Sequence, residues 1–433
     1  MVLACLQAER AFFMNIALPI LVLPLPEQNY SCHGCGNCCR DFTVQLRAAD
    51  LEKLRAQEWE AKLGMSVTTE FRGTVYLKQR EDGACIFLMD DGLCRIHREY
   101  GFAEKPIACQ LFPFVLVPDD QRTRVGISFA CQSVRENKGA VLRSHLSEID
   151  RMSQALPQTR VATYSAMLAD ALGAKEGELE ALAQVVDRFL ARDDVAMSER
   201  FDGLAFIASS LGRAKLAQVR AQRFTELVVL LATALPGELE HVPLDEALPK
   251  QLRLLRQAVY ARIEDVQVNR AKALGRMRTV ITQMLASRSF TRGKGAVPNV
   301  ARGILRDTTY ADIARVPRLS LSKDRDAIDA LFTRYTRATI LGGRAWGAGY
   351  YGWPAVRGLQ ALTLNLACTA WLARALAAAR HHDEVTIDDA RDALGRIDRH
   401  AGRAPWLGSV GERLRLEFFR LDDGLRRIVR ESI

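Results

Sequence analysis

The chain has 433 residues, of which 48% are hydrophobic and 26% are charged, so it can bury a sizeable core and lies outside the disordered range. Its formal net charge is +9, but the excess arginines are scattered among Ala and Leu along predicted helices, without a compact basic block. The composition therefore gives little support to nucleic-acid binding. The length favours two domains and makes stabilisation by disulfides unnecessary.

The first 28 residues are treated as a leader. Their apolar part, residues 11–26, is shorter than the roughly 18 residues that suggest a membrane-spanning helix. Pro19, Pro24 and Pro26 interrupt it, and neither a basic start nor a small-residue cleavage site accompanies it. We therefore expect neither membrane insertion nor export.

The leader contains an alternative start, Met14, which would make the residues before it, including Cys5, an artefact of annotation. Residues 16–23 would then form an apolar strand that leads into the cysteines. We expect a cytoplasmic protein, and a cytoplasmic address implies reduced thiols rather than disulfides.

Residues 29–140 have the pattern of a small, loop-rich α+β unit. Apolar residues at near-helical spacing predict a helix at residues 48–63, and a strand-like run follows at 74–78. Two further runs, 114–117 and 124–130, are separated by a turn and predict a hairpin. A unit this rich in loops is expected to depend on a metal to hold it together.

Residues 141–433 differ in composition and pattern: they contain long Ala/Leu/Arg segments of helical periodicity and almost no cysteine. Helices are expected at 176–191, 200–235, 252–287, 328–340, 356–380 and 387–400. Thr386 and Asp389 have the spacing of a capping box at the start of the last helix. The predicted fold class is therefore α+β: a small cysteine-rich, metal-binding N-terminal domain followed by a larger all-α domain.

Eight of the ten cysteines lie in the N-terminal unit, four of them within the stretch CHGCGNCC. Thiolates are soft ligands that favour zinc, cuprous copper and iron–sulfur clusters. A C-x-x-C step lets one tight loop deliver two sulfurs, and Gly34 and Gly36 suit such a loop because glycine accepts a positive φ. The alternatives, inert buried thiols, a redox dithiol or a disulfide framework, explain this density less well. We predict a metal or iron–sulfur site.

The spacing of Cys32, Cys35 and Cys38 is that of the first three ligands of a bacterial ferredoxin loop, although Cys39 then departs from that pattern. Two adjacent cysteines rarely serve one tetrahedral metal. Either Cys38 and Cys39 serve different centres, or one of them is not a direct ligand. An all-thiol set favours an iron–sulfur cluster over zinc. His97 would extend a C-x-x-H step to mixed zinc ligation, but an ordinary histidine is the preferred interpretation.

The stretch CHGCGNCC, followed by ACIFLMDDGLCRIHREYGFAEKPIACQLFPF, resembles the YkgJ-like CxxCxxCC cysteine-cluster family, which is described as zinc- or iron-chelating. The resemblance covers residues 30–133 and is specific. It implies a metal-binding role, with zinc or an iron–sulfur cluster as cofactor. The ligands that it implies are Cys32, Cys35, Cys38, Cys39, Cys85, Cys94, Cys109 and Cys131.

The order of a cysteine cluster and a long helical region is also similar to that of flagellin lysine N-methylase, with a looser likeness at residues 331–399. This second resemblance implies an alternative function, S-adenosylmethionine-dependent protein lysine N-methylation. Under either hypothesis, the helical domain engages a protein partner or substrate. The sequence names no catalytic or S-adenosylmethionine-binding residue.

Three other features invite a functional interpretation. The stretch GAGYYG at residues 347–352 matches a dinucleotide-binding fingerprint, but no strand precedes it, so an aromatic loop between helices is expected. His381 and His382 follow a long helix, where a capping role is expected. Cys368 lies within an apolar helix and is expected to be an inert core residue.

Overall fold

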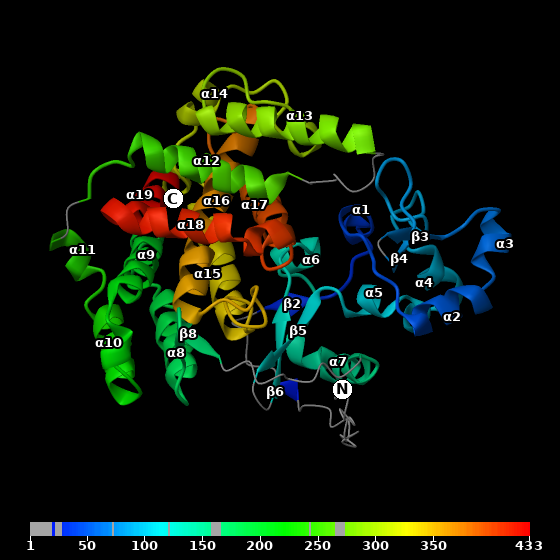
Figure 1. The fold of residues 1–433 in the computed structure, drawn as a ribbon, viewed down its shortest axis with the longest axis horizontal. Coiled ribbons are helices and arrows are strands. Elements are labelled where there is room, and N and C mark those ends of the chain that lie inside the picture. Colours follow the sequence, from blue (N-terminus) through cyan, green and yellow to red (C-terminus); the bar gives the residue numbers. More distant parts are fainter. Residues whose placement is uncertain are drawn as a thin grey trace, which may run out of the picture.

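The computed structural model describes residues 20–21, 28–71, 73–119, 122–156, 166–241, 244–264 and 273–433. A cysteine-rich region of short strands, short helices and loops lies beside a larger helical body (Figure 1). This arrangement confirms the predicted fold class. Cys5, Met14 and most of the strand expected at residues 16–23 lie outside the described residues. The division of the chain at residues 28 and 140 stays a prediction.

The cysteine-rich region is built from elements of two to nine residues. They are β2 (Asn29–Tyr30), α1 (Asn37–Asp41), α2 (Ala48–Ala56), α3 (Trp59–Leu63), β3 (Thr68–Phe71), β4 (Thr74–Leu77), α4 (Arg95–Tyr100), the 3₁₀ helix η1 (Phe102–Glu104) and α5 (Ile107–Leu111). These elements enclose a small core of their own, which consists of Leu46, Leu54, Trp59, Val67, Leu77, Cys85, Phe87 and Ile96. Such a core is small for about 70 residues of chain, which leaves room for a metal to contribute stability.

The single helix expected at residues 48–63 is wrong, because the chain breaks between α2 and α3. Glu58 adopts a left-handed conformation with a φ of 56°, which ends one helix and redirects the next. Trp59 can then enter the small core, where it is 1% exposed and its ring lies 5.0 Å from that of Phe87. The indole N–H of Trp59 donates to the Gln57 side chain, which satisfies its one polar group.

The predicted hairpin is confirmed, with altered bounds. Strand β5 (Phe114–Asp119) pairs antiparallel with β6 (Arg122–Ile127), and Phe114 lies opposite Ile127. The apolar leader adds β1 (Ile20–Leu21), which pairs in parallel with β6, so part of the expected N-terminal strand is present. The hairpin packs into the core of the helical body, because Val125 and Ile127 belong to that core.

Short elements connect the hairpin to the helical body. They are α6 (Gln132–Arg135), β7 (Ala140–Val141), η2 (Leu142–His145), α7 (Leu146–Gln154), β8 (Met167–Ala169) and β9 (Leu172–Gly173). Strand β7 pairs with β2, and β8 pairs with β9, so the region expected to be all-helical also contains a small hairpin.

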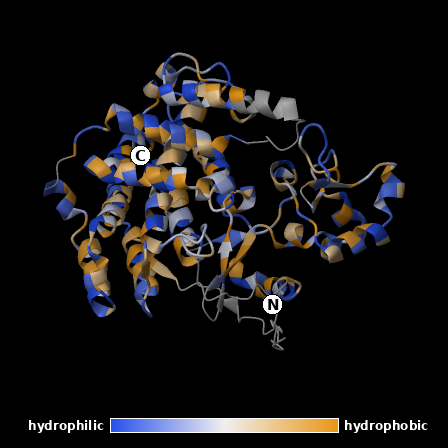
Figure 2. Cartoon of the chain, in the orientation of Figure 1, coloured by the Kyte–Doolittle hydropathy of each residue, from blue (hydrophilic) through white to orange (hydrophobic). Residues whose placement is uncertain are grey.

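The helical body follows, and its helices surround α16 (Figure 1). They are α8 (Glu178–Leu190), α9 (Met197–Arg213), η3 (Leu216–Gln218), α10 (Gln222–Thr233), α11 (Gly237–His241), α12 (Pro249–Ile263), α13 (Ala273–Arg292), η4 (Ala301–Gly303), α14 (Tyr310–Arg315), η5 (Leu319–Leu321), α15 (Arg325–Leu341), α16 (Ala355–Ala379), α17 (Ile387–His400), η6 (Pro405–Gly408), α18 (Val410–Arg420), η7 (Leu421–Asp423) and α19 (Gly424–Ser432). Figure 2 shows both hydrophobic and hydrophilic residues along the outer helices, as amphipathic helices require.

Helix α16 is, within the described ranges, the one helix long and apolar enough to cross a membrane. However, 89% of its most apolar window is buried inside the protein, where it contacts α9, α12, α17 and α19. Its Cys368 is fully buried, as expected of an inert core residue. The apolar composition of α16 therefore fits its place as the central helix of the body.

Two of the expected helices are interrupted. The helix expected at 200–235 is wrong, because α9 and α10 are separated by η3 and by Ala221, which has a φ of 53°. The cause lies elsewhere in the chain: the buried carboxylate of Glu178 accepts hydrogen bonds from the Ala221 amide and from the Arg220 guanidinium. The helix expected at 252–287 is also divided, since α12 ends at Ile263.

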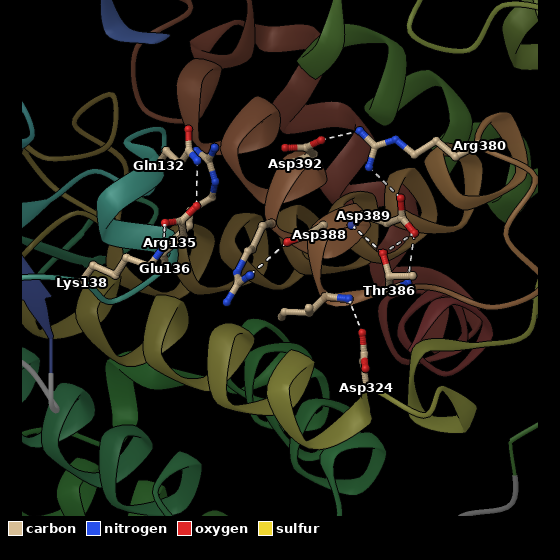
Figure 3. Close-up of polar contacts among 12 residues, drawn as sticks. Gln132, Arg135, Glu136, Lys138, Asp324, Arg380, Thr386, Asp388, Asp389 and Asp392 are labelled. Carbon is tan, nitrogen blue, oxygen red and sulfur yellow. Dashed lines mark hydrogen bonds and ion pairs between the residues drawn. The ribbon is translucent and has the colours of Figure 1, made fainter. Parts of the chain in front are cut away.

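The start of α17 agrees with the predicted capping box. The Thr386 hydroxyl accepts a hydrogen bond from the Asp389 amide, and the Asp389 carboxylate accepts one from the Thr386 amide. His382 also contacts the same carboxylate, with 2.9 Å between Nδ1 and Oδ2. Figure 3 shows Arg380, Thr386 and Asp389 at this helix start. The sequence led us to expect that the histidine pair caps the end of the preceding helix. The backbone amides of His381 and His382 do donate to the Ala378 and Ala377 carbonyls there, but the His382 side chain contacts the start of α17 instead.

Candidate metal centre

Seven cysteines from four separate segments line one cavity of about 100 Å³. They are Cys32, Cys35, Cys38, Cys39, Cys94, Cys109 and Cys131. The eighth predicted residue, Cys85, is buried directly beside them, and its amide donates to the Cys39 carbonyl at 2.7 Å. The fold thus gathers cysteines that lie up to about a hundred residues apart in the sequence.

The loop from Cys32 to Cys39 depends on its two glycines. Gly34 and Gly36 have φ angles of 67° and 71°, a left-handed conformation that glycine adopts at low cost. A Cβ atom on Gly36 would lie 3.0 Å from the Gly92 carbonyl oxygen and 3.1 Å from Leu88. The glycines therefore allow the cysteine loop to pack directly against the turn that precedes Cys94, as expected from the sequence for a tight ligand loop.

Several of the cysteines lie at the beginnings of short helices. Cys38 and Cys39 are in the first turn of α1, while Cys94 and Cys131 are the N-cap residues of α4 and α6. Amides near a helix start can donate to a thiolate. For Cys131, burial raises the pKa to about 11, although hydrogen bonds from the amides of Val134 and Ser133 oppose the shift.

Burial makes most of these thiols hard to ionise without a cation. It raises the pKa of Cys85 to about 11 and also raises the pKa values of Cys35 and Cys109. The neighbouring thiol of Cys39, together with burial, raises the pKa of Cys38. A soft metal ion supplies the positive charge that such a cluster requires, because coordination deprotonates the thiols that bind it.

One positive side chain, Lys105, lies at the cavity wall. Its charge opposes the rise in the pKa values of Cys38 and Cys109, and its Nζ atom lies 5.2 Å from the centre of the Phe102 ring. His97 also lines the cavity, and burial followed by the charge of Lys105 lowers its pKa. From the sequence, Lys105 was not singled out as a site residue. Its position four residues before Cys109 was the available signal.

The eight thiols can be divided by their packing: four belong to the small core or pack against it, and four do not. The four thiols that do not pack against the small core are called the outer group, and they are Cys32, Cys35, Cys38 and Cys131. This group is joined across the chain by two hydrogen bonds between the Cys32–Cys39 loop and α6: His33 Nδ1 lies 2.6 Å from Ser133 Oγ, and Asn37 Nδ2 donates to Gln132 Oε1 at 2.8 Å.

The other four thiols are called the inner group, and they are Cys39, Cys85, Cys94 and Cys109. Cys85 belongs to the small core, and the other three pack against it. Cys94 also forms a β-bridge with Leu88. The two groups meet at Cys38 and Cys39, whose thiols interact with each other. The side chains of these two adjacent cysteines therefore lie together rather than pointing apart.

The thiols are ligands that a soft metal prefers, but their side chains do not converge on one point in this structure. All nine described cysteines are free of disulfides, as expected for a thiol site. Among the described residues, however, no three His, Cys, Asp or Glu side chains converge at metal-binding distance. The thiols surround a shared cavity, and side-chain rotation would be needed to bring four of them onto one ion.

A comparison with known protein families bears directly on this region. Residues 31–137 match the CxxCxxCC family model. That model is described as a "putative zinc- or iron-chelating domain". The match confirms the CxxCxxCC resemblance noted in the sequence and supports a metal cofactor. It includes all eight predicted ligands, although their individual roles stay a prediction.

Among curated proteins, an uncharacterized protein from Methanocaldococcus jannaschii is 31% identical over 112 residues. The similarity covers 25% of this chain and 38% of that protein. The chain therefore matches well under half of the relative's length. No solved structure matched.

The stretch GAGYYG forms a compact loop between α15 and α16 rather than a nucleotide-binding turn. The amides of Tyr350 and Gly352 both donate to the Gly347 carbonyl. The rings of Tyr350 and Tyr351 lie 4.9 Å apart, and Trp353 packs against both. These aromatic residues pack between helices, as the sequence led us to expect.

Proposed function

We propose that the CxxCxxCC segment binds metal through its eight cysteines, arranged as two four-thiolate sites that adjoin at Cys38 and Cys39. The observation that carries this proposal is that seven cysteines line one cavity. The eighth, Cys85, lies beside them, and its amide donates a hydrogen bond to the Cys39 carbonyl. The outer group would form one site and the inner group the other. Each set contains four thiols, the number that tetrahedral zinc and iron–sulfur clusters require.

Three observations support this division. Two hydrogen bonds connect α6 to the Cys32–Cys39 loop, which supports grouping Cys131 with the cysteines of that loop. The inner group shares the small core. Cys38 and Cys39 occupy the junction, so adjacent cysteines can serve adjacent sites without competing for one ion.

We favour an iron–sulfur cluster over zinc as the bound group. Every proposed ligand is a thiol, and the first three have ferredoxin-like spacing. When bound, a cluster would supply electron transfer or an organising centre. The protein's own contribution is to hold the thiols, exclude water with the small core, and place the positive charge of Lys105 at the cavity wall.

The test is metal analysis of protein purified without oxygen. We expect a brown preparation with iron and acid-labile sulfide, and visible absorption that dithionite bleaches. A colourless protein with stoichiometric zinc would overturn the choice of metal and leave the ligand set standing. A protein that retains neither metal, even after reconstitution with iron and sulfide or with zinc, would refute the proposed function.

The helical body is proposed to engage a protein partner or substrate. The proposed location is the cytoplasm, which the free thiols of the described cysteines support. The alternative function, S-adenosylmethionine-dependent lysine methylation, gains no support from the CxxCxxCC model or from the matched relative. We therefore do not adopt it.

A further inference from the structure

A buried carboxylate of the helical body contacts the loop that carries Cys131. Asp398, on α17, is 1% exposed. Its Oδ2 atom accepts hydrogen bonds from the Ser128 hydroxyl at 2.8 Å and from the Ala130 amide at 3.1 Å. These donors lie immediately before Cys131 in the chain but some 270 residues from Asp398. The contact therefore joins the outer thiol group to the helical body.

A buried arginine completes this connection. Arg344, which follows α15, donates to Asp398 Oδ1 at 3.0 Å and to the Ile127 carbonyl at 2.6 Å. Its stem packs tightly against the hairpin, because a Cβ atom on Gly126 would lie 2.8 Å from Arg344 Cδ. Asp398 and Arg344 thus hold residues 127–130 through backbone and side-chain hydrogen bonds with little room for adjustment.

The other side of Cys131 is also held by the helical body. Helix α6, which directly follows its N-cap residue Cys131, contains the buried Arg135. A Cβ atom on Gly395 of α17 would lie 2.3 Å from the Arg135 guanidinium. Arg334 of α15 donates to the Arg135 carbonyl at 2.8 Å. Figure 3 shows α6, with Gln132 and Arg135, beside α17. Cys131 is therefore positioned by the helical body from both directions.

We propose that Asp398 is a positioning residue for Cys131 and couples metal binding in the outer group to the helical body. The inference rests on the proposed metal-binding function. Because coupling is reciprocal, metal bound at Cys131 should stabilise the contacts of α17 just as α17 favours the metal-binding position of Cys131. The helical body would then offer its proposed partner a surface whose mobility differs between the metal-loaded and the metal-free states.

The critical variant is Asp398→Asn in the full-length protein. An amide cannot accept from the Ser128 hydroxyl and the Ala130 amide on one atom while also accepting from Arg344 on the other. The new amide NH₂ group would face either the Arg344 guanidinium or the two donors of the loop, and the loop before Cys131 would shift. Residues that orient metal ligands typically change metal affinity by about 10- to 100-fold when mutated. We expect release of the outer-group metal to a chelator to accelerate by about this factor.

The matched control is Asp389→Asn. Asp389 is also fully buried on α17 and accepts several hydrogen bonds, including one from Arg380 (Figure 3). It lies about 13 Å along the helix from Asp398. Its variant should destabilise the body but release metal as the wild type does. Equal release rates from the two variants, whether both fast or both slow, would overturn the inference.

A second readout separates coupling from a merely structural role. In the wild type and in Asp389→Asn, metal loading should slow hydrogen exchange in residues 387–400, whereas in Asp398→Asn that metal dependence should disappear. A metal effect on α17 that persists in Asp398→Asn would contradict the coupling. If the wild type binds no metal, the proposed function itself fails, which is a distinct result.

Should Asp398→Asn fail to fold, Ser128→Ala decides the question. It removes one of the donors and leaves the carboxylate intact. Ser322→Ala is its control, because Ser322 is also buried and donates to a backbone carbonyl, that of Val385, away from the cysteines. Faster metal release from Ser128→Ala than from Ser322→Ala supports the inference, and equal release refutes it.

Discussion

The amide of Cys85 donates a hydrogen bond of 2.7 Å to the carbonyl of Cys39. This bond holds the buried Cys85 against the cysteine loop, and Cys39, unlike its neighbour Cys38, packs against the small core. The thiols of the two adjacent cysteines interact with each other, and Cys38 also acts electrostatically on Cys85 and Cys109.

The first prediction concerns these adjacent cysteines. Cys38→Ser should remove the metal of the outer group, and Cys39→Ser should remove the metal of the inner group. If each group holds one centre of the same kind, each variant should retain about half of the wild-type metal content. Elemental analysis after anaerobic purification measures this. Cys368→Ala removes a thiol from the core of α16 and should lose no metal. Complete loss in both ligand variants would indicate one shared centre instead.

The second prediction concerns the glycine that begins α1. Gly36→Ala should weaken metal retention, because the new Cβ would press against the Gly92 carbonyl and Leu88 in addition to the cost of a left-handed alanine, roughly 1–2 kcal/mol. Gly64→Ala is the control: Gly64 has a φ of 63°, and nothing lies within 4 Å of its Cβ position. Chelator competition should distinguish the variants. Similar metal retention in both would show that the close packing of the loop is dispensable.

The third prediction concerns metal removal. The small core contains few buried side chains, among them Trp59 and Phe87, whereas the helical body has an extensive core of its own. Chelation should therefore raise hydrogen exchange and protease cleavage selectively in residues 42–112, while the helices of the body stay protected. Unchanged exchange in residues 42–112 after the metal is gone would show that metal does not stabilise this region.

The fourth prediction concerns pH. Burial alone would raise the pKa of Glu178, but hydrogen bonds from Arg220 and from two backbone amides outweigh it and lower the pKa from 4.5 to about 2. A carboxyl group whose pKa is lower in the folded state stabilises the fold above its unfolded pKa. That stability is lost as the pH falls from about 4.5 to 2, and it amounts to at most about 3 kcal/mol.

Comparing denaturant unfolding of the wild type with that of Glu178→Gln checks this expectation. The free-energy difference between them should be largest near neutral pH and should shrink as the pH falls toward 2. Glu176→Gln, at an exposed position nearby, should show little difference at any pH. A difference that does not depend on pH would mean that Glu178 acts through shape rather than charge.

The fifth prediction concerns the cap of α17. Thr386→Ala should destabilise the protein by about 1 kcal/mol, because the Asp389 amide loses its hydrogen-bond acceptor. Ser409 occupies the corresponding position before α18 but makes no side-chain cap hydrogen bond, so Ser409→Ala should cost less. Thermal unfolding of the two variants measures the difference. Equal effects would argue that capping at Thr386 contributes little.

The sequence predicted well those elements whose causes are local. The bounds of α17 agree with its capping box and periodicity, and α16 agrees to within a residue at each end. The sequence did not indicate the breaks inside the helices expected at 48–63 and 200–235. Glu58 and Ala221 take positive φ angles that neither residue favours by itself. At Ala221 the turn is held by a residue distant in sequence, because the Glu178 carboxylate accepts a hydrogen bond from the Ala221 amide. Helices α18 and α19 were not anticipated at all.

For the metal site, the sequence by itself determined the chemistry of the donors and the form of the first loop. Close spacing in CHGCGNCC brings several sulfurs together whatever the rest of the chain does, and Gly34 and Gly36 permit the turn. Only the tertiary structure brings the distant Cys94, Cys109 and Cys131 to the cavity that this loop lines, and only it shows that Asp398 of the helical body holds the loop before Cys131. The physical reason is that short spacing constrains the chain locally, whereas partners far apart in sequence meet only through the packing of the elements between them.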